Sequence, residues 1–248
     1  AGFEEAASVG DAGSASRSVA LADVDGDGDL DVVIGNRRAE NEILLNDGRG
    51  GFVARRTFGA AADETIQIRV ADVDGDGALD LVSAERSAQS SVRFGDGKGA
   101  FGRVVAFGLA EDGTRAVDVA DFDRDGAMDI VEGNLQGANV IYFGDGKGRF
   151  VRTLTLPGTH ATAALRAHDL DRDGHVDIVL GNSEQSNVVL MGRKDGGFVE
   201  LPLREDLADD TYGIALGDLN GDGYLDIVEA NSDAWNLVHL TRVVGGSP

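Results

Sequence analysis

The sequence of 248 residues contains no cysteine, so it has neither a disulfide framework nor a thiolate metal site. No apolar run approaches the roughly 18 residues that a membrane-spanning helix needs, and we expect no membrane insertion. Basic residues are scarce: 22 of them face 44 acidic residues, which gives a net charge of −22. Such a surplus would repel the phosphates of nucleic acid, so a nucleic-acid partner is not expected.

Proline is also rare, with 3 residues against 36 glycines, and this ratio indicates many tight turns rather than long helices. The chain begins at Ala1 without a methionine, so we expect a trimmed or processed piece whose targeting segment is not shown. Hydrophobic residues make up 42% of the sequence, which is enough for a sizeable core.

An aspartate-rich motif recurs five times along the chain, at residues 23–31, 72–80, 121–129, 169–177 and 218–226. The copies are spaced by 48 or 49 residues, so five units account for the whole of residues 1–248 as one domain. Each unit reads as four short strands; in the third copy these are residues 115–120, 128–132, 139–143 and 150–156, with a glycine-rich turn at 144–148.

Repeated four-stranded units of this length predict an all-β fold, a five-bladed β-propeller. A linear solenoid is the rival, but it would need polar caps at both ends. The fifth copy ends after its third strand, residues 236–241, whereas Phe3 aligns with the phenylalanine that opens the fourth strand in other copies. The N-terminal strand is therefore predicted to complete the last blade and to close the ring.

The spacing inside the motif is that of a metal-binding loop. Alternate side chains of a tight loop converge on one point, glycine at position 6 permits the sharp turn, and position 7 offers its backbone carbonyl. An anionic cage made only of oxygen suits Ca²⁺, and we expect about five ions, one per blade. The side-chain ligands at positions 1, 3, 5 and 9 would be Asp23, Asp25, Asp27 and Asp31; Asp72, Asp74, Asp76 and Asp80; Asp121, Asp123, Asp125 and Asp129; Asp169, Asp171, Asp173 and Asp177; and Asp218, Asn220, Asp222 and Asp226. Position 7 is occupied by Asp29, Ala78, Ala127, His175 and Tyr224.

Two alternatives compete with this interpretation. A helix–loop–helix calcium hand begins in the same way, but it requires a glutamate at position 12 and a helix afterwards. Position 12 here is Ile34, Ser83, Glu132, Leu180 or Glu229, and each loop leads into a strand-like segment. The other alternative is an Asp/Gly turn without an ion, which is credible for one copy but would leave five clusters of repelling carboxylates.

These loops, the apolar pairs that follow them, such as Val32-Val33, and the D-G-x-G-x-F turns, such as 145–150, resemble the FG-GAP or VCBS-type propeller repeats. That family is known from integrin α-subunit heads, secreted propellers and related lectins, and the resemblance implies calcium in the loop between the first and second strands. The familiar ring has seven blades, whereas this chain encodes five, which implies a small ring, a fragment or an engineered product.

The predicted function is non-catalytic binding: a calcium-stabilised scaffold that recognises a protein or a carbohydrate on the face opposite the calcium loops. The loops on that face differ between copies, which is typical of recognition surfaces. A lectin is one alternative, with Trp235 and Tyr212 as candidate aromatic platforms. An accessory domain of a secreted enzyme is another, although no nucleophile is paired with a base, and we predict no catalytic or cofactor-binding residues. Dependence on calcium predicts a secreted, extracellular or periplasmic location, with the chain a monomer.

Overall fold

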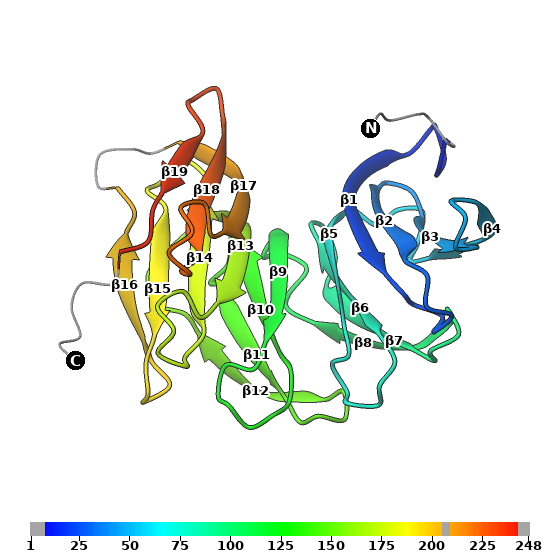
Figure 1. Cartoon of the computed structure of the whole chain (residues 1–248), viewed down its shortest axis with the longest axis horizontal. Helices are drawn as coiled ribbons and strands as arrows, with labels where there is room; N and C mark the ends of the chain where they lie inside the picture. The colour runs from blue at the N-terminus through cyan, green and yellow to red at the C-terminus, as the bar shows by residue number, and fades with distance from the viewer. Residues whose placement is uncertain (1–7, 205–208, 243–248) are drawn as a thin grey trace. The chain divides into compact units, whose positions relative to one another are not determined.

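A computed structural model describes residues 8–204 and 209–242, and these residues form an all-β protein without helices. Their antiparallel sheets are the blades of a five-bladed β-propeller, which confirms the predicted fold class (Figure 1). The chain divides into two compact units, which are described one at a time. Unit 1 comprises Ala1–Thr114 and Gly144–Arg149, and unit 2 comprises Arg115–Phe143 and Phe150–Pro248.

Unit 1 holds the first two blades, each with four strands in sequence order. Blade 1 consists of β1 (Ala15–Ala22), β2 (Asp31–Arg37), β3 (Asn41–Asn46) and β4 (Phe52–Phe58). Blade 2 consists of β5 (Thr65–Ala71), β6 (Asp80–Glu85), β7 (Ser90–Gly95) and β8 (Phe101–Phe107). Tight turns join neighbouring strands, as the 36 glycines and the scarcity of helix-forming periodicity predict.

Unit 2 holds the other three blades, apart from a few residues of the third. Blade 3 consists of β9 (Thr114–Ala120), β10 (Asp129–Asn134), β11 (Val140–Gly144) and β12 (Phe150–Thr155). Blade 4 consists of β13 (Thr162–His168), β14 (Asp177–Asn182), β15 (Val188–Gly192) and β16 (Phe198–Pro202). Blade 5 consists of β17 (Asp210–Gly217), β18 (Asp226–Ser232) and β19 (Leu237–His239).

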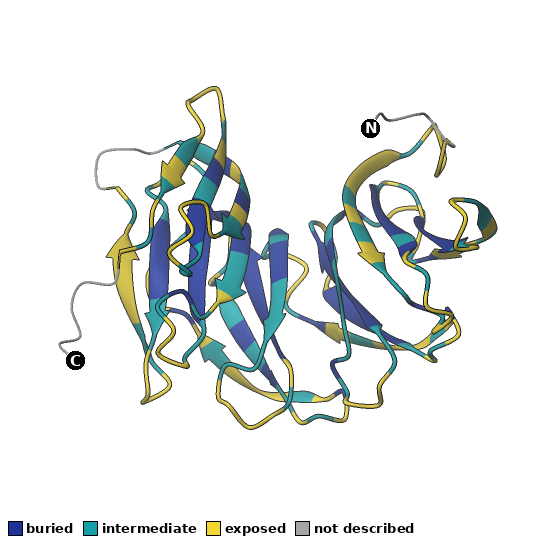
Figure 2. Ribbon diagram, in the orientation of Figure 1, coloured by how far each residue is buried: buried dark blue, intermediate teal, exposed yellow. Residues whose placement is uncertain are grey.

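The second strand is the most buried element of blades 2, 3 and 4. Every residue of β6, β10 and β14 is buried, whereas the fourth strands β4, β8, β12 and β16 are largely exposed (Figure 2). Apolar residues that follow the aspartate loops therefore lie in the core, as Leu81 and Val82 of β6 and Ile178 and Val179 of β14 do. Apolar clusters fill the space between neighbouring blades of the same unit: one around Val33 and Ile68 in unit 1, and two around Leu165 and Ile214 in unit 2.

The first strands share a local irregularity that the hydrophobic pattern did not predict. Their pairing with the second strand shifts by one residue after Ser16, Thr65, Thr162 and Thr211. Such a bulge turns one side chain out of the regular alternation. In these four strands the residue directly before the shift carries a hydroxyl group.

Blade 5 has three strands among the described residues, in the order β17-β18-β19. The predicted fourth strand at the N-terminus involves residues 1–7, which lie outside the described residues, so closure by that strand stays a prediction. The single-domain organisation also stays a prediction. No helix in the part of the chain that the structure describes could cross a membrane.

Candidate metal-binding loops

Each aspartate loop joins the first strand of a blade to the second and curls around its position-1 carboxylate. In blade 2, Asp72 accepts hydrogen bonds from the backbone N–H groups of Gly75, at 2.8 Å, and Gly77, at 2.9 Å. Both glycines have positive φ, +73° and +91°, which the tight turn requires. The position-1 aspartate thus fixes the loop conformation, and the same bonds recur at Asp23 and Asp218.

The position-9 aspartate ties the loop to the end of the third strand. In blade 2, Asp80 accepts the N–H of Val73, at 2.9 Å, through one oxygen and the N–H of Gly95, at 2.9 Å, through the other. The same pair of bonds occurs at Asp31, Asp177 and Asp226. Position 9 is therefore a structural residue as well as a candidate ligand, because each carboxylate oxygen retains a second lone pair.

The position-3 aspartate is the group that most directly indicates a cation. Oδ1 of Asp74 is shielded from solvent and accepts no hydrogen bond from the described residues. A buried carboxylate oxygen without a partner is costly, and a hard divalent cation at this point would satisfy it. Asp72 and Asp80 each place a carboxylate oxygen within 4.8 Å of one on Asp74.

Groups of three carboxylates form in four of the five loops, from positions 1, 3 and 9 in loops 2, 3 and 4 and from positions 1, 3 and 5 in loop 1. In each of them three carboxylates offer oxygen atoms that all lie within 4.8 Å of one another: Asp23, Asp25 and Asp27; Asp72, Asp74 and Asp80; Asp121, Asp123 and Asp129; and Asp169, Asp171 and Asp177. The donors are all oxygen, which fits Ca²⁺ and excludes a soft-metal preference.

The residues at positions 5 and 7 of each loop are joined by a hydrogen bond. Asp76 accepts the backbone N–H of Ala78 at 2.8 Å, and this bond from position 7 to position 5 recurs in each loop. His175, at position 7 of the fourth loop, donates its N–H to Asp173 in this way. The predicted roles of the position-7 carbonyls as ligands stay predictions.

The fifth loop differs from the others because position 3 carries an amide. Asn220 donates its Nδ2 hydrogen to Oδ2 of Asp222, at 2.9 Å, and its Oδ1 accepts the N–H of the same residue, at 2.9 Å. The bond from Nδ2 is one that an aspartate at this position cannot donate. The fifth predicted calcium site is the one that the structure supports least.

Burial, reinforced by the neighbouring carboxylates, raises the pKa of two position-9 aspartates. Burial raises the pKa of Asp80 to about 6 against the opposing hydrogen bonds from Gly95 and Val73, and the charges of Asp74 and Asp72 act in the same direction as burial. Burial likewise raises the pKa of Asp177 to about 6. Without a cation, keeping these carboxylates ionised costs free energy, and a bound cation would remove that cost.

A second constellation, which the sequence reasoning missed, joins neighbouring blades on the side of the second-to-third-strand loops. Asn41 donates to the Thr65 hydroxyl at 3.0 Å, and this hydroxyl donates to Glu85 at 2.8 Å. In unit 2, Asn187 donates to Thr211, which donates to Asn231. The bulges in the first strands place these hydroxyls.

A constant spacing could have revealed these hydroxyls. A serine or threonine stands seven residues before the first aspartate of every loop: Ser16, Thr65, Thr114, Thr162 and Thr211. The paired asparagines that frame the variable loops are thus engaged inside the fold. Asn36, which is buried, accepts from the Ser16 hydroxyl and donates to the Glu40 carbonyl, so this amide serves the fold.

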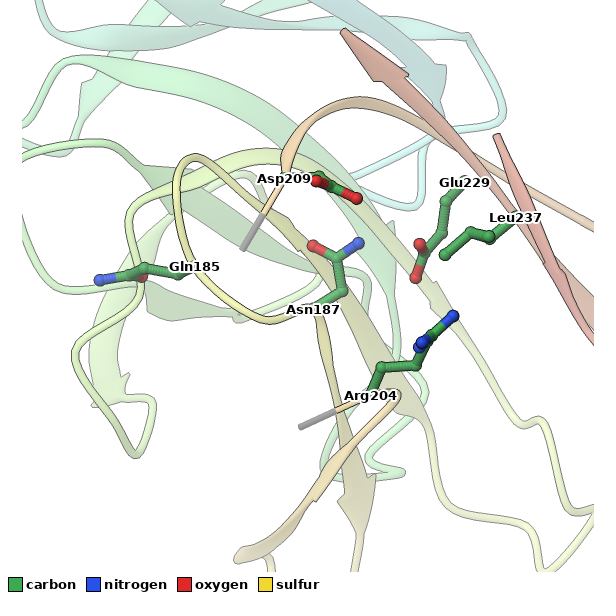
Figure 3. A pocket seen from close by; sticks show the side chains of 6 residues that line it. All are labelled: Gln185, Asn187, Arg204, Asp209, Glu229 and Leu237. Carbon is green, nitrogen blue, oxygen red and sulfur yellow. The ribbon is translucent and has the colours of Figure 1, made fainter. Parts of the chain in front are cut away.

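Unit 2 also contains a small polar hollow between blades 4 and 5. It is lined by Gln185, Asn187, Arg204, Asp209, Glu229 and Leu237 (Figure 3). Its deepest group is the buried Glu229, whose carboxylate lies 3.0 Å from Nε2 of His239. Burial acts to raise the pKa of Glu229, but hydrogen bonds from His239 and Asn187 outweigh it and hold the pKa below its ordinary value.

Comparison with known proteins identifies the family. The model of the FG-GAP-like repeat matches residues 23–83, 72–132 and 169–229, which together span well over half of the chain and include all five loops. The chain belongs to the FG-GAP-like repeat family. No curated protein sequence matches it.

Solved structures show the same fold at low sequence identity. A crystal structure of BBS1N in complex with ARL6DN, soaked with lead, has a TM-score of 0.60 and 13% identity, over 90% of this chain and 69% of that chain. A second crystal of this complex, soaked with mercury, has a TM-score of 0.58 and 11% identity, over 90% of this chain and 77% of that chain. At this identity the likeness is one of fold.

Proposed function

We propose that this FG-GAP-like propeller is a non-catalytic recognition module whose blades are held by calcium ions in the aspartate loops. The observation that carries the proposal is the buried Oδ1 of Asp74, which accepts no hydrogen bond from any described residue and belongs to a group of three carboxylates. The same arrangement of three carboxylates in loops 3 and 4, and a related group in loop 1, support a repeated structural ion rather than a single catalytic one.

In each such loop, the carboxylates at positions 1, 3, 5 and 9 and the carbonyl at position 7 would hold the ion. A bound calcium ion would neutralise the carboxylates and cross-link the two ends of the loop. Hydrogen bonds within the chain shape the loop itself. Asp72 orders the turn by accepting the N–H groups of Gly75 and Gly77, and Asp80 connects it to the end of β7 by accepting the N–H of Gly95. The ion thus adds to a loop that the backbone has already shaped.

Recognition of a protein partner is supported by the fold likeness and by the loop pattern. The similar BBS1N structures are complexes with another protein, ARL6DN. In this chain the loops between the second and third strands differ in sequence from blade to blade, and the asparagines that frame them serve the fold. A constant frame that presents variable loops suits partner recognition.

A glycan ligand is a second candidate, favoured by one observation. Trp235 lies 88% exposed between β18 and β19, and Tyr212 of β17 is 59% exposed. Exposed aromatic rings are the usual platforms for sugars. A glycan array screened with the native chain and with Trp235→Ala would separate the two candidates, since binding that this substitution abolishes would favour the glycan.

The calcium proposal is tested by titration calorimetry and thermal unfolding of the full chain. We expect binding of about four or five Ca²⁺ ions, a melting temperature that falls by several degrees in chelator, and weak competition by Mg²⁺. Asp72→Ala should remove one ion while the other blades keep theirs. If the titration shows no heat of calcium binding and the melting temperature is unchanged in chelator, the calcium proposal is overturned. We also propose that the chain works outside the cytoplasm, where calcium is millimolar.

A further inference from the structure

Blade 2 contains an arginine that is fixed against its metal loop. Nη2 of Arg103, on β8, lies 2.5 Å from Oδ2 of Asp74, the position-3 aspartate. The guanidinium carbon lies 3.4 Å from the centroid of the Phe94 ring on β7, and Phe94 is the cross-strand partner of Arg103. Gly148 closes the other side, since a Cβ there would lie 2.4 Å from Nη2 of Arg103. The guanidinium therefore has little freedom to leave the carboxylate.

Blade 3 repeats the arrangement with different residues. Arg152 on β12 forms an ion pair with Asp123, again the position-3 aspartate, and its guanidinium carbon lies 3.4 Å from the centroid of the Phe143 ring. The residue aligned with these arginines is Ala54 in blade 1 and Glu200 in blade 4. The residue aligned with the phenylalanines is leucine in blade 1 and methionine in blade 4, so arginine and phenylalanine occur together.

We propose that Arg103 and Arg152 are built-in counter-charges that divide the loops into two classes, lowering the calcium affinity of loops 2 and 3 and holding these loops together when calcium is scarce. The inference rests on the calcium function proposed above and specifies how that site is regulated. Loops 1 and 4, which lack the arginine, are the tighter sites and the ones that depend on calcium for their order.

The two oxygens of the Asp74 carboxylate have different surroundings. Arg103 donates to Oδ2, while Oδ1 is buried and accepts no hydrogen bond from the residues that the structure describes. Calcium can bind Oδ1 without displacing the arginine, but the guanidinium charge then repels the ion across a single carboxylate. After screening by solvent, we expect this repulsion to lower the calcium affinity by a factor on the order of ten. Without calcium, the same guanidinium removes part of the repulsion among the three carboxylates.

The chain supplies a matched control in blade 1. Nη1 of Arg56 donates to the carbonyl of Lys98 at 3.1 Å, in the turn of the next repeat, just as Nη1 of Arg103 donates to the carbonyl of Lys147 at 3.4 Å. Arg56 forms no ion pair with the position-3 aspartate Asp25 among the described residues. Arg56→Gln thus loses the turn contact alone, whereas Arg103→Gln loses the turn contact and the carboxylate contact together.

The experiment compares calcium isotherms and chelator melting temperatures of the full-length wild type, Arg103→Gln and Arg56→Gln. We expect Arg103→Gln to tighten one calcium site about tenfold and to melt lower than wild type in chelator, with the gap closing in millimolar calcium. Arg56→Gln should leave every affinity within about twofold of wild type. In an Asp72→Ala background, which removes site 2, Arg103→Gln should no longer change the isotherm.

Arg152→Gln repeats the test in blade 3 and keeps it decisive should Arg103→Gln fail to fold. Calcium binding by wild type without a tighter site in either arginine variant would overturn the inference and leave the calcium function standing. Weaker binding in these variants would show that the arginines pre-organise the carboxylates, which also overturns it. Absence of calcium binding by wild type would instead overturn the proposed function.

Discussion

Blade 2 has Glu85 at the position where the other four blades have asparagine, and this single residue affects the stability of the chain. Its Oε1 accepts the Thr65 hydroxyl at 2.8 Å, but Oε2 is buried and accepts no hydrogen bond from the described residues. Burial raises the pKa of Glu85 to about 7 against the opposing effect of the Thr65 hydroxyl. The nearby negative charge of Asp63 adds to the effect of burial, and Arg93 opposes it.

The raised pKa fixes the sign of the pH dependence. Below the unfolded value of 4.5 the carboxyl is protonated in both states, and folding carries no penalty from it. As pH rises toward 7, the unfolded chain releases the proton first and stability is lost. Glu85→Gln should therefore stabilise the chain by about 1 to 3 kcal/mol at pH 8, and the gain should shrink toward zero near pH 4.5.

Urea unfolding of wild type and Glu85→Gln, at saturating calcium and at both pH values, measures this difference. The exposed Glu40 provides a control, since Glu40→Gln should change the free energy of unfolding by less than about 0.5 kcal/mol at either pH. A gain for Glu85→Gln that is equal at the two pH values would argue that the side chain acts through packing rather than ionisation.

Contacts between residues close in the sequence could be predicted from their spacing, whereas contacts between distant residues could not. The aspartates of one loop are two residues apart, so their convergence follows from local geometry. Arg103 and Asp74 are 29 residues apart, and their contact depends on the register of β7 against β8. Sequence reasoning did not determine that register and therefore did not find the ion pair.

At the scale of the element, the fifth loop provides a direct test of what makes a loop bind calcium. Asn220 and Asp222 are joined by two hydrogen bonds, so we expect this loop to depend less on a cation than the others. Asn220→Asp restores the position-3 carboxylate found in the other loops, and we expect it to tighten the weakest calcium site by about tenfold or more. It should also lower the melting temperature in chelator, because it adds repulsion.

Calorimetric titration of Asn220→Asp beside the reverse change Asp25→Asn in loop 1 gives the matched comparison. Asp25→Asn should weaken one site and raise the melting temperature in chelator. Identical isotherms for wild type and Asn220→Asp would mean that the amide oxygen serves as well as a carboxylate at position 3.

Strands were predicted closely because their limits are set by local patterns. In the third repeat the predicted strand at 115–120 corresponds to β9 (Thr114–Ala120), and the segment at 150–156 corresponds to β12 (Phe150–Thr155). Alternating β-branched residues between glycine-rich turns are sufficient for this. The bulge after Thr65 escaped prediction because it leaves the apolar pattern intact and shows only in the pairing of β5 with β6.

At the scale of the whole molecule, the net charge of −22 opposes folding, and the aspartate loops concentrate that charge. Bound calcium removes repulsion where carboxylates are closest, whereas monovalent salt screens it everywhere. Screening shortens the range of the interaction from about 30 Å at 0.01 M to about 10 Å at 0.1 M. Added sodium chloride should therefore stabilise the calcium-free chain, and stabilise the calcium-loaded chain less, because five ions would bring the net charge to roughly −12.

The measurement is the melting temperature from 0.01 to 0.5 M sodium chloride, once in chelator and once in millimolar calcium. We expect a rise of several degrees in chelator and at most half that rise with calcium. Potassium chloride should give the same curve, because screening depends on ionic strength rather than on a specific ion. Equal slopes with and without calcium would show that the loop carboxylates contribute little to the charge repulsion. The stabilisation by calcium would then come from fixing the geometry of each loop, in support of hydrogen bonds such as those that Asp80 accepts from Val73 and Gly95.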